Sequence, residues 1–372
     1  MPNSFLTSFL SEVTASLTNR HEDNYDYYRF GLPNQQKQRR SWKAVAIDYL
    51  RQKGFGLAGA WAVKTLAAVK LIEPHLLRLE WLFGCLADDQ SRAILVKILA
   101  YRALGHRRVR LPLSTPAYWD GIQQMERLAD QTNVIAVPNF SQQLCHMNLG
   151  RIGAPIQLYY TPLGAYIQFV LEQYKYSGDQ TVIQAEPGNY VIDAGACWGD
   201  TALYFAHLAG KDGRVYSFEF IPSNLQILRK NLGLNPGLSE RVHVVERAVW
   251  GESDLRLYYR DRGPGSNVSF DQNGGSDGSV TTLTIDDLVV NNGLPQVDFI
   301  KMDIEGAELQ ALRGAARTLK QFRPKLAVCL YHRLSDFVDI PEYVASLDLG
   351  YRLHIRHFTI HAEETVLFAE AS

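Results

Sequence analysis

Short apolar runs alternate with stretches of helical spacing in the second half of the chain. In the helical stretches, apolar residues recur every three or four positions, which is typical of helices that pack one face against a sheet. Such alternation indicates a mostly parallel sheet with helices on both faces. The apolar runs predict strands over 190–194, 215–218, 242–246, 297–302 and 325–330.

The end of the chain departs from that alternation. Two strand-like runs, 351–358 and 365–369, are joined by a short polar connection that contains His361. A short connection between two strands is typical of a hairpin. We therefore expect an antiparallel strand pair to close one edge of the sheet.

The first half of the chain carries no such alternation and predicts mainly helices. Residues 1–40 are polar, with Pro33 near their end, and are interpreted as a loosely ordered lead. Helical spacing begins at Ser41 and continues with breaks to about residue 110. The segment 109–157 is irregular and punctuated by prolines, which predicts a connector that contains one helix.

A chain of 372 residues is long enough for two domains. A helix expected over 162–176 leads directly into the first strand of the sheet, so it belongs with that domain. The expected organisation is a mainly helical accessory domain with its connector over 1–150, followed by an α/β domain over 151–372.

Composition and charge narrow the classes of function. Basic and acidic side chains nearly balance, 38 against 39, whereas a nucleic-acid-binding protein usually carries a basic excess. The four cysteines include no CxxC pair, which argues against a zinc site or a disulfide framework and favours a reducing compartment. The first 19 residues lack Lys and Arg, and the most apolar stretch, 54–72, is interrupted by Lys64 and Lys70. We therefore expect a cytoplasmic protein with no secretory signal, no membrane span and no nucleic-acid partner.

The strongest chemical signal follows the first strand, where the sequence reads Val-Ile-Asp-Ala-Gly-Ala-Cys-Trp-Gly-Asp over 191–200. Gly195 permits a tight turn with the backbone close to a ligand, and the next helix directs its N–H groups at the same crevice. The spacing Asp-x-Gly-x-x-x-Gly differs from the dinucleotide pattern, and Asp193 would repel two phosphates but could organise the turn beside the ammonium of a methionine moiety. S-adenosylmethionine is therefore favoured over a nicotinamide cofactor and over a glycine turn without a ligand. The candidate cofactor-binding residues of this turn are Asp193, Ala194, Gly195, Ala196, Cys197, Gly199, Asp200 and Thr201.

The ends of the following strands extend the candidate cofactor site. Glu219 ends the second strand at roughly the distance from the glycine turn, about 20 residues, at which an acid binds ribose hydroxyls in dinucleotide folds. The alternative for Glu219 is a solvated strand end. Phe220 is placed to pack on an adenine, and Arg247 and Ala248 follow the third strand. Tyr176 precedes the first strand, where its ring could cover the methionine end.

Carboxylates gather where the fourth strand ends. Asp303, Glu305 and Glu308 follow the run 297–302, and His332 follows the next strand. An imidazole beside a carboxylate can take a proton from a hydroxyl, or the pair can share a divalent metal. We favour the base role and expect no metal, because magnesium prefers oxygen ligands. The candidate catalytic residues are Asp303, His332 and Glu305, with Asp303 also facing the cofactor; the alternative is that Asp303 and Glu305 cap the helix and His332 merely packs.

The segment 262–280 is rich in Gly, Ser, Asn and Asp. Such a composition is typical of a mobile lid that closes on a substrate, and equally of a surface hairpin. The sequence leaves both interpretations open.

Together these residues resemble the FkbM-type methyltransferases. The resemblance covers about residues 160–372, and its most specific part is the Lys-x-Asp-x-Glu-Gly-x-Glu block over 301–308. It implies a class I methyltransferase fold with a Rossmann-like, mostly parallel seven-stranded sheet, S-adenosyl-L-methionine as the cofactor, and O-methylation of a sugar hydroxyl or a natural-product intermediate. Cys197 and Trp198 depart from the small or aliphatic residues that are commoner at this turn.

We therefore expect an S-adenosylmethionine-dependent O-methyltransferase that follows a helical domain. Its acceptor would be a small molecule or a glycan, and a homodimer is left open. Because the leaving sulfide needs no acid, the protein would mainly position the reactants and help to remove one proton. The alternatives are a catalytically silent domain that binds the cofactor or a protein partner and, less favoured, a nicotinamide oxidoreductase.

Overall fold

The computed structural model describes residues 4–31, 56–138, 140, 142–178, 180–271 and 275–371. The chain forms two compact units, one of Met1–Tyr118 with His357–Glu364 and the other of Trp119–Arg356 with Thr365–Ser372. This division falls earlier than the expected boundary at 150, and the first unit also includes a segment from near the C-terminus. The start of the predicted helical region, 41–55, lies outside the described residues.

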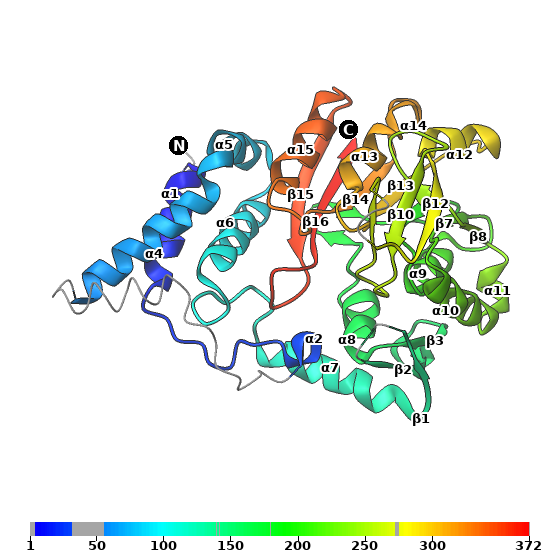
Figure 1. Ribbon diagram of the computed structural model, residues 1–372, viewed down its shortest axis with the longest axis horizontal. Helices are drawn as coiled ribbons and strands as arrows, with labels where there is room; N and C mark the ends of the chain where they lie inside the picture. Colours follow the sequence, from blue (N-terminus) through cyan, green and yellow to red (C-terminus); the bar gives the residue numbers. More distant parts are fainter. Residues whose placement is uncertain are drawn as a thin grey trace. The chain divides into compact units, whose positions relative to one another are not determined.

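The described part of the first unit is built from helices (Figure 1). Three of them begin at a polar cap, where the side chains of Ser4, Asp26 and Asp88 each accept a hydrogen bond from a backbone N–H of the first turn. The elements are α1 (Phe5–Ser16), α2 (Tyr27–Phe30), α4 (Gly56–Ile72), the 3-10 helix η1 (Glu73–His75), α5 (Leu76–Cys85), α6 (Asp89–Leu104) and the start of α7 (Pro116–Leu128).

Helix α1 corrects the expectation of a loose lead over residues 1–40. Phe5, Phe9 and Val13 recur at every fourth position, so they lie on one helical face, and all three are fully buried. The carboxylate of Glu80 accepts hydrogen bonds from the first two N–H groups of the helix, each at 2.9 Å. The three buried side chains and the carboxylate of Glu80 therefore hold this part of the polar segment as a helix.

The predicted connector contains a small antiparallel sheet besides the expected helix α7. Its strands are β1 (Ala129–Ala136), β2 (Gln143–Asn148) and β3 (Gln157–Tyr160), paired in that order. The amide of Asn231 hydrogen-bonds both backbone groups of Tyr159, at 2.7 and 3.1 Å, and Asn235 does the same for Gln157, at 2.9 and 2.6 Å. Two side-chain amides thus form hydrogen bonds with backbone N–H and C=O groups at the outer edge of β3, where a further strand would otherwise pair.

The second unit is built on a seven-stranded sheet of order β15-β16-β14-β13-β6-β7-β8. Strand β16 (Thr365–Ala371) runs antiparallel to β14, and β15 (Tyr351–His357) lies beyond it at the edge (the orange and red strands of Figure 1). The pairs β14–β13, β13–β6, β6–β7 and β7–β8 are parallel, and the predicted strand runs are confirmed. These strands are β6 (Tyr190–Ala194), β7 (Arg214–Phe218), β8 (Val242–Val245), β13 (Phe299–Met302) and β14 (Lys325–Cys329).

The helix predicted over 162–176 ends earlier than expected. Helix α8 (Pro162–Ala165) continues as the π-helix η3 (Tyr166–Val170), and Glu172 then has a φ of 51°. A left-handed residue cannot continue a right-handed helix, and the chain pairs next as β4 (Tyr176–Ser177) with β5 (Val182–Ile183). The other helices of this unit are α9 (Asp200–Ala209), α10 (Pro222–Gly233), α11 (Pro236–Ser239), α12 (Ile285–Asn291), α13 (Glu308–Arg313), α14 (Ala316–Phe322) and α15 (Asp336–Ser346).

A four-stranded sheet of order β11-β10-β12-β9 follows β8 in the chain. It consists of β9 (Ala248–Val249), β10 (Arg256–Arg260), β11 (Asn267–Ser269) and β12 (Gly278–Leu283). The glycine-rich segment 262–280 therefore includes β11 and the start of β12. No helix in the described part of the chain is long and apolar enough to cross a membrane.

Candidate functional site

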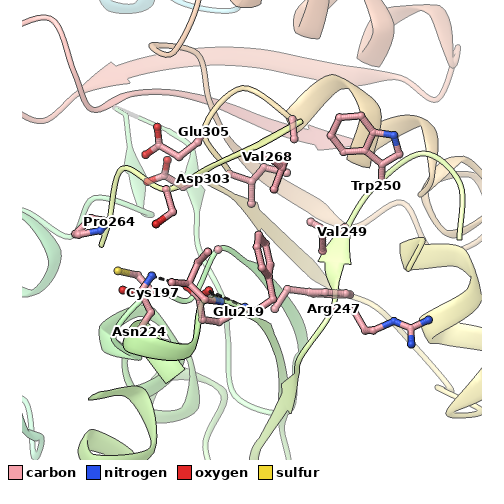
Figure 2. Close-up of a pocket in the computed structure, with 18 of the residues that line it drawn as sticks. Cys197, Glu219, Asn224, Arg247, Val249, Trp250, Pro264, Val268, Asp303 and Glu305 are labelled. Atoms are coloured by element: carbon pink, nitrogen blue, oxygen red, sulfur yellow. Dashed lines mark hydrogen bonds between the residues drawn. The ribbon is translucent and has the colours of Figure 1, made fainter. Parts of the chain in front are cut away.

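A cavity opens at the carboxyl ends of β6, β7 and β13, the edge at which parallel α/β sheets bind their ligands. Its volume is about 660 Å³ including its open mouth. Figure 2 shows Asp303 and Glu305 on one side of the cavity and Glu219 with Asn224 on the other.

The turn after β6 leaves no room for a side chain at Gly195. Its φ is +87°, and a Cβ at this position would lie 2.0 Å from the carbonyl oxygen of Asp303. The N–H groups of Gly195 and Ala196 donate to the carbonyl oxygen of Phe218 at 3.1 and 2.9 Å. Glycine is required here because the turn brings the ends of β6, β7 and β13 into close contact.

Asp193 lies beneath this turn and does not line the cavity. Its fully buried carboxylate accepts hydrogen bonds from Thr201, at 2.9 and 3.0 Å, and from Ser217, at 3.0 Å. The amine of Lys301 lies 3.2 Å from the carboxylate and donates to the carbonyl oxygens of Ala194 and Gly195 at 3.2 and 2.6 Å. Asp193 therefore supports the turn from below.

Lys301 keeps its charge inside the protein. Burial lowers the pKa of its amine, but the carboxylates of Asp193 and Asp303 act in the opposite direction and raise the pKa above its usual value. A charged amine between two backbone carbonyl oxygens and a carboxylate holds the glycine turn in one conformation.

Glu219 lines the cavity, as predicted, and is 7% exposed. Its Oε1 accepts hydrogen bonds from the N–H groups of Phe220 and Ile221 at 2.6 and 2.7 Å, and its Oε2 accepts one from the Asn224 amide at 3.1 Å. Burial raises the pKa of Glu219 to about 7, although the three hydrogen bonds oppose this shift. Because each carboxylate oxygen can accept two hydrogen bonds, Oε2 keeps capacity for a ligand hydroxyl.

Other predicted cofactor residues divide into two groups. Cys197, Phe220, Arg247, Ala248 and Asp303 line the cavity together with Gly195 and Glu219. The guanidinium of Arg247 extends away from it (Figure 2) and donates to Asp254 at 2.8 Å. The residues that do not line the cavity are Asp193, Ala194, Ala196, Gly199, Asp200, Thr201 and Tyr176.

Two of these residues have other contacts. The ring of Tyr176 packs on His354, with centroids 4.4 Å apart, because the chain has left the helix and pairs there as β4. Asp200 is buried and accepts a hydrogen bond from Tyr160 at 2.9 Å. Neither contact places the side chain at the cavity.

Several lining residues were not predicted. Asn224 lies in the first turn of α10, and Trp250 follows β9. Pro264 and Val268 come from the segment 262–280, whose composition had left a lid and a surface hairpin equally open. The composition was the only sequence signal that this segment could line a cavity. Its contact with the cavity depends on how β10 and β11 are placed, which the sequence does not state.

Three carboxylates surround the imidazole of His332 beside the cavity. Its Nε2 lies 3.1 Å from Asp303 Oδ1 and 3.1 Å from Glu308 Oε1, and its Nδ1 lies 3.6 Å from Glu305 Oε2. The predicted convergence of Asp303 and His332 at adjacent strand ends is therefore present. Asp303 also accepts hydrogen bonds from the hydroxyls of Tyr174, at 3.0 Å, and Tyr331, at 2.9 Å.

These contacts argue against the expected base role of His332. Burial lowers the pKa of His332, but the hydrogen bonds with Asp303 and Glu308 outweigh it and raise the pKa well above its usual value. Burial likewise favours the neutral form of Asp303, yet His332 and Lys301 hold the pKa of that carboxyl well below its usual value. In the protein without a bound metal, an imidazole that already carries a second proton at neutral pH has no lone pair with which to take another.

Comparison with known proteins agrees with this geometry. Residues 193–353 match the family model of the methyltransferase FkbM domain. This part of the chain is a FkbM-type methyltransferase domain. The matched domain is of the S-adenosylmethionine-dependent methyltransferase class.

A solved structure of a methyltransferase FkbM shows the same fold. The methyltransferase FkbM from Methylobacillus flagellatus KT is similar, with 22% sequence identity and a TM-score of 0.50 over 87% of this chain and 69% of that chain. Fibrillarin from Aeropyrum pernix, solved with S-adenosyl-L-methionine bound, has 13% identity and a TM-score of 0.36 over 64% of this chain and 99% of its own. A search of curated proteins gives no match. The expected α/β fold of class I methyltransferases is thus confirmed in its general form.

Proposed function

We propose that the cavity binds S-adenosylmethionine and that the enzyme methylates a hydroxyl oxygen of a small-molecule or glycan acceptor. The observation that carries this proposal is the pairing of two acidic sides in one cavity, Glu219 on one and Asp303 with Glu305 on the other. Glu219 would accept hydrogen bonds from the ribose hydroxyls. Ile221 and Val249 supply apolar wall for the adenine.

The charge of the cavity fits this cofactor. A sulfonium and an ammonium group are both attracted by carboxylates, whereas the two phosphates of a dinucleotide would be repelled. When bound, S-adenosylmethionine supplies an electrophilic methyl group whose leaving sulfide needs no acid. The residues of this chain then have to orient the acceptor and remove one proton.

Glu305 is the best-placed acceptor for that proton. It lines the cavity, and its side chain is 39% exposed, compared with 21% for Asp303 and 7% for His332. Its φ of +56° is rare for a residue with a side chain, and such strain is common where a side chain is held for function. We assign Asp303 and His332 to positioning, because their polar atoms are engaged with each other.

Calorimetry with the full chain and release of S-adenosylhomocysteine with a panel of acceptor classes would test this function. Glu305→Gln should keep cofactor affinity within about twofold and lower kcat by about 100-fold, a typical contribution of a general base. Glu246→Gln is the matched control, since this exposed acid follows β8 and pairs with Arg229.

Three results would contradict parts of the proposal. Absence of S-adenosylmethionine binding would reject the cavity as the cofactor site. Binding without turnover on any acceptor would favour the alternative of a catalytically silent module, and unchanged kcat in Glu305→Gln would remove this residue from the chemistry.

A further inference from the structure

We propose that Asp303, Glu308 and His332 form a binding site for one divalent transition-metal ion beside the cavity. Each residue offers one ligand atom, and these atoms lie within 4.8 Å of one another. The separations of His332 Nε2 from the two carboxylates are both 3.1 Å. Ligands about 2.1 Å from an ion lie at about such distances from each other when they occupy adjacent coordination positions.

Glu308 supplies the observation that points to a ligand. The residue is 0% exposed, and its Oε1 accepts a hydrogen bond from the N–H of Ile304 at 2.8 Å. Among the described residues, its Oε2 is buried and has no hydrogen-bond partner. A buried carboxylate oxygen without a partner is costly, and a bound cation would satisfy it.

The three carboxylates give the site an excess of negative charge. Asp303, Glu305 and Glu308 face a single imidazole. The amine of Lys301 is already engaged with Asp193 and with the carbonyl oxygens of the glycine turn. A divalent cation would balance the negative charge that remains.

The second nitrogen of His332 is arranged as in metal sites. Nδ1 faces Glu305 at 3.6 Å, while Nε2 faces the other two carboxylates. Metal-bound histidines commonly donate their remaining N–H to a carboxylate, which fixes the tautomer and directs the other nitrogen at the ion. Glu305 lies on the Nδ1 side of the ring, at an ion-pair distance longer than a hydrogen bond, and is not one of the three ligands.

The ligand set selects the class of metal. Two carboxylates and one imidazole suit Mn²⁺, Fe²⁺, Co²⁺ or Zn²⁺, whereas Mg²⁺ and Ca²⁺ prefer oxygen ligands throughout. Because Asp303 lines the cavity, an ion here lies where an acceptor hydroxyl could coordinate it. Only this catalytic consequence depends on the proposed function; metal binding itself does not.

The test uses the full chain, stripped with EDTA and dialysed. Mn²⁺ binding is followed by electron paramagnetic resonance, and Co²⁺ by its visible absorption bands. Wild-type protein should bind one ion per chain, and Glu308→Gln should weaken Mn²⁺ binding at least tenfold. Asp286→Asn is the matched control, because Asp286 is a buried carboxylate that accepts hydrogen bonds from Thr318 elsewhere in the fold, and it should bind Mn²⁺ as wild type does.

If Glu308→Gln does not fold, His332→Gln takes its place. This variant should lose the visible absorption bands of bound Co²⁺. No binding by wild type at millimolar Mn²⁺ or Zn²⁺ would overturn the proposal, as would equal affinity in wild type and in either variant. The cluster would then be an ion pair of protonated His332. Calorimetric titration of the metal-free protein with S-adenosylmethionine keeps the two proposals separate, because either ligand can bind when the other fails.

Discussion

Lys301 is a charged side chain in a strand that is buried along its whole length. Lysine is seldom fully buried unless it is paired, and here its amine contacts Asp193 and two carbonyl oxygens of the glycine turn. The conformation of this turn at the cavity therefore depends on a residue that does not line the cavity.

Replacing Lys301 with Met should destabilise the fold by about 3–5 kcal/mol, because the carboxylate of Asp193 would remain buried without its cation. The free energy of unfolding in urea measures this change. The double variant Asp193→Asn/Lys301→Met should recover part of the loss. A double variant less stable than the single one would show that the ion pair is not the cause.

Glu219 should give the proposed cofactor site a pH dependence. Its pKa of about 7 means that the free carboxyl is protonated below that pH, and only the ionised form accepts both ribose hydroxyls. The affinity for S-adenosylmethionine should therefore fall as the pH drops through 7, by about tenfold between pH 8 and pH 6. Calorimetry at both pH values measures it.

Glu219→Gln should bind the cofactor more weakly at pH 8 and show no such fall. Asp200→Asn is the control, since burial raises the pKa of Asp200 to about 6 but its side chain does not line the cavity. A pH dependence that persists in Glu219→Gln would assign it to another group. The same raised pKa has a consequence for stability: the folded state holds a proton that the unfolded state has lost, so the contribution of Glu219 decreases as the pH rises towards 7.

Among elements, helix α1 shows what apolar spacing alone can establish. The segment is mostly polar, but apolar residues recur at every fourth position. These residues, Phe5, Phe9 and Val13, are fully buried. The helix could have been predicted from that spacing.

Phe9→Ala should lower the free energy of unfolding of the first unit by about 3–5 kcal/mol, through lost burial and the cavity left behind. Hydrogen exchange of peptides from α1 and α6, read by mass spectrometry, would detect the local loss. The exposed Ser11→Ala on the same helix should leave exchange unchanged. Equal exchange in wild type and Phe9→Ala would show that α1 does not anchor this unit.

The small sheet of β1, β2 and β3 shows the opposite case. β1 reads Ala-Asp-Gln-Thr-Asn-Val-Ile-Ala and is mostly exposed or half-buried, so it carries no alternation from which a strand could be predicted. It forms because backbone groups pair across strands, and because Asn231 and Asn235 close the far edge. Pairing between backbones leaves little trace in a single sequence.

At the scale of the whole molecule, the first unit is completed by His357–Glu364. Glu363 pairs with Arg29 at 2.8 Å, and the guanidinium of Arg102 donates to the carbonyl oxygen of Ala362 at 3.1 Å. The ring of His361 packs on that of Phe30, with centroids 5.1 Å apart. This short connection between β15 and β16 therefore belongs to the core of the helical unit.

Replacing residues 358–363 with a Gly-Ser segment of equal length should increase hydrogen exchange in α2 and α6, because their contacts with this segment are lost. Exchange in β6 and β7 should stay as in wild type, since neither strand touches it. Mass spectrometry of the full chain measures both regions together. Unchanged exchange in α2 and α6 would show that the first unit does not need the segment.

The sequence by itself determined the parallel strands, the glycine turn at Gly195 and the acids at the strand ends, Glu219 and Asp303, because strand periodicity and turn chemistry are local properties. Only the tertiary structure decided which side chains reach the cavity. Asp193 lies beneath the glycine turn and contacts Lys301. Three carboxylates surround His332, two of them on the turn and helix after β13 rather than at a strand end. The pKa values of these groups depend on neighbours that lie far away in the sequence. The sequence pattern does not contain the distances between them in space.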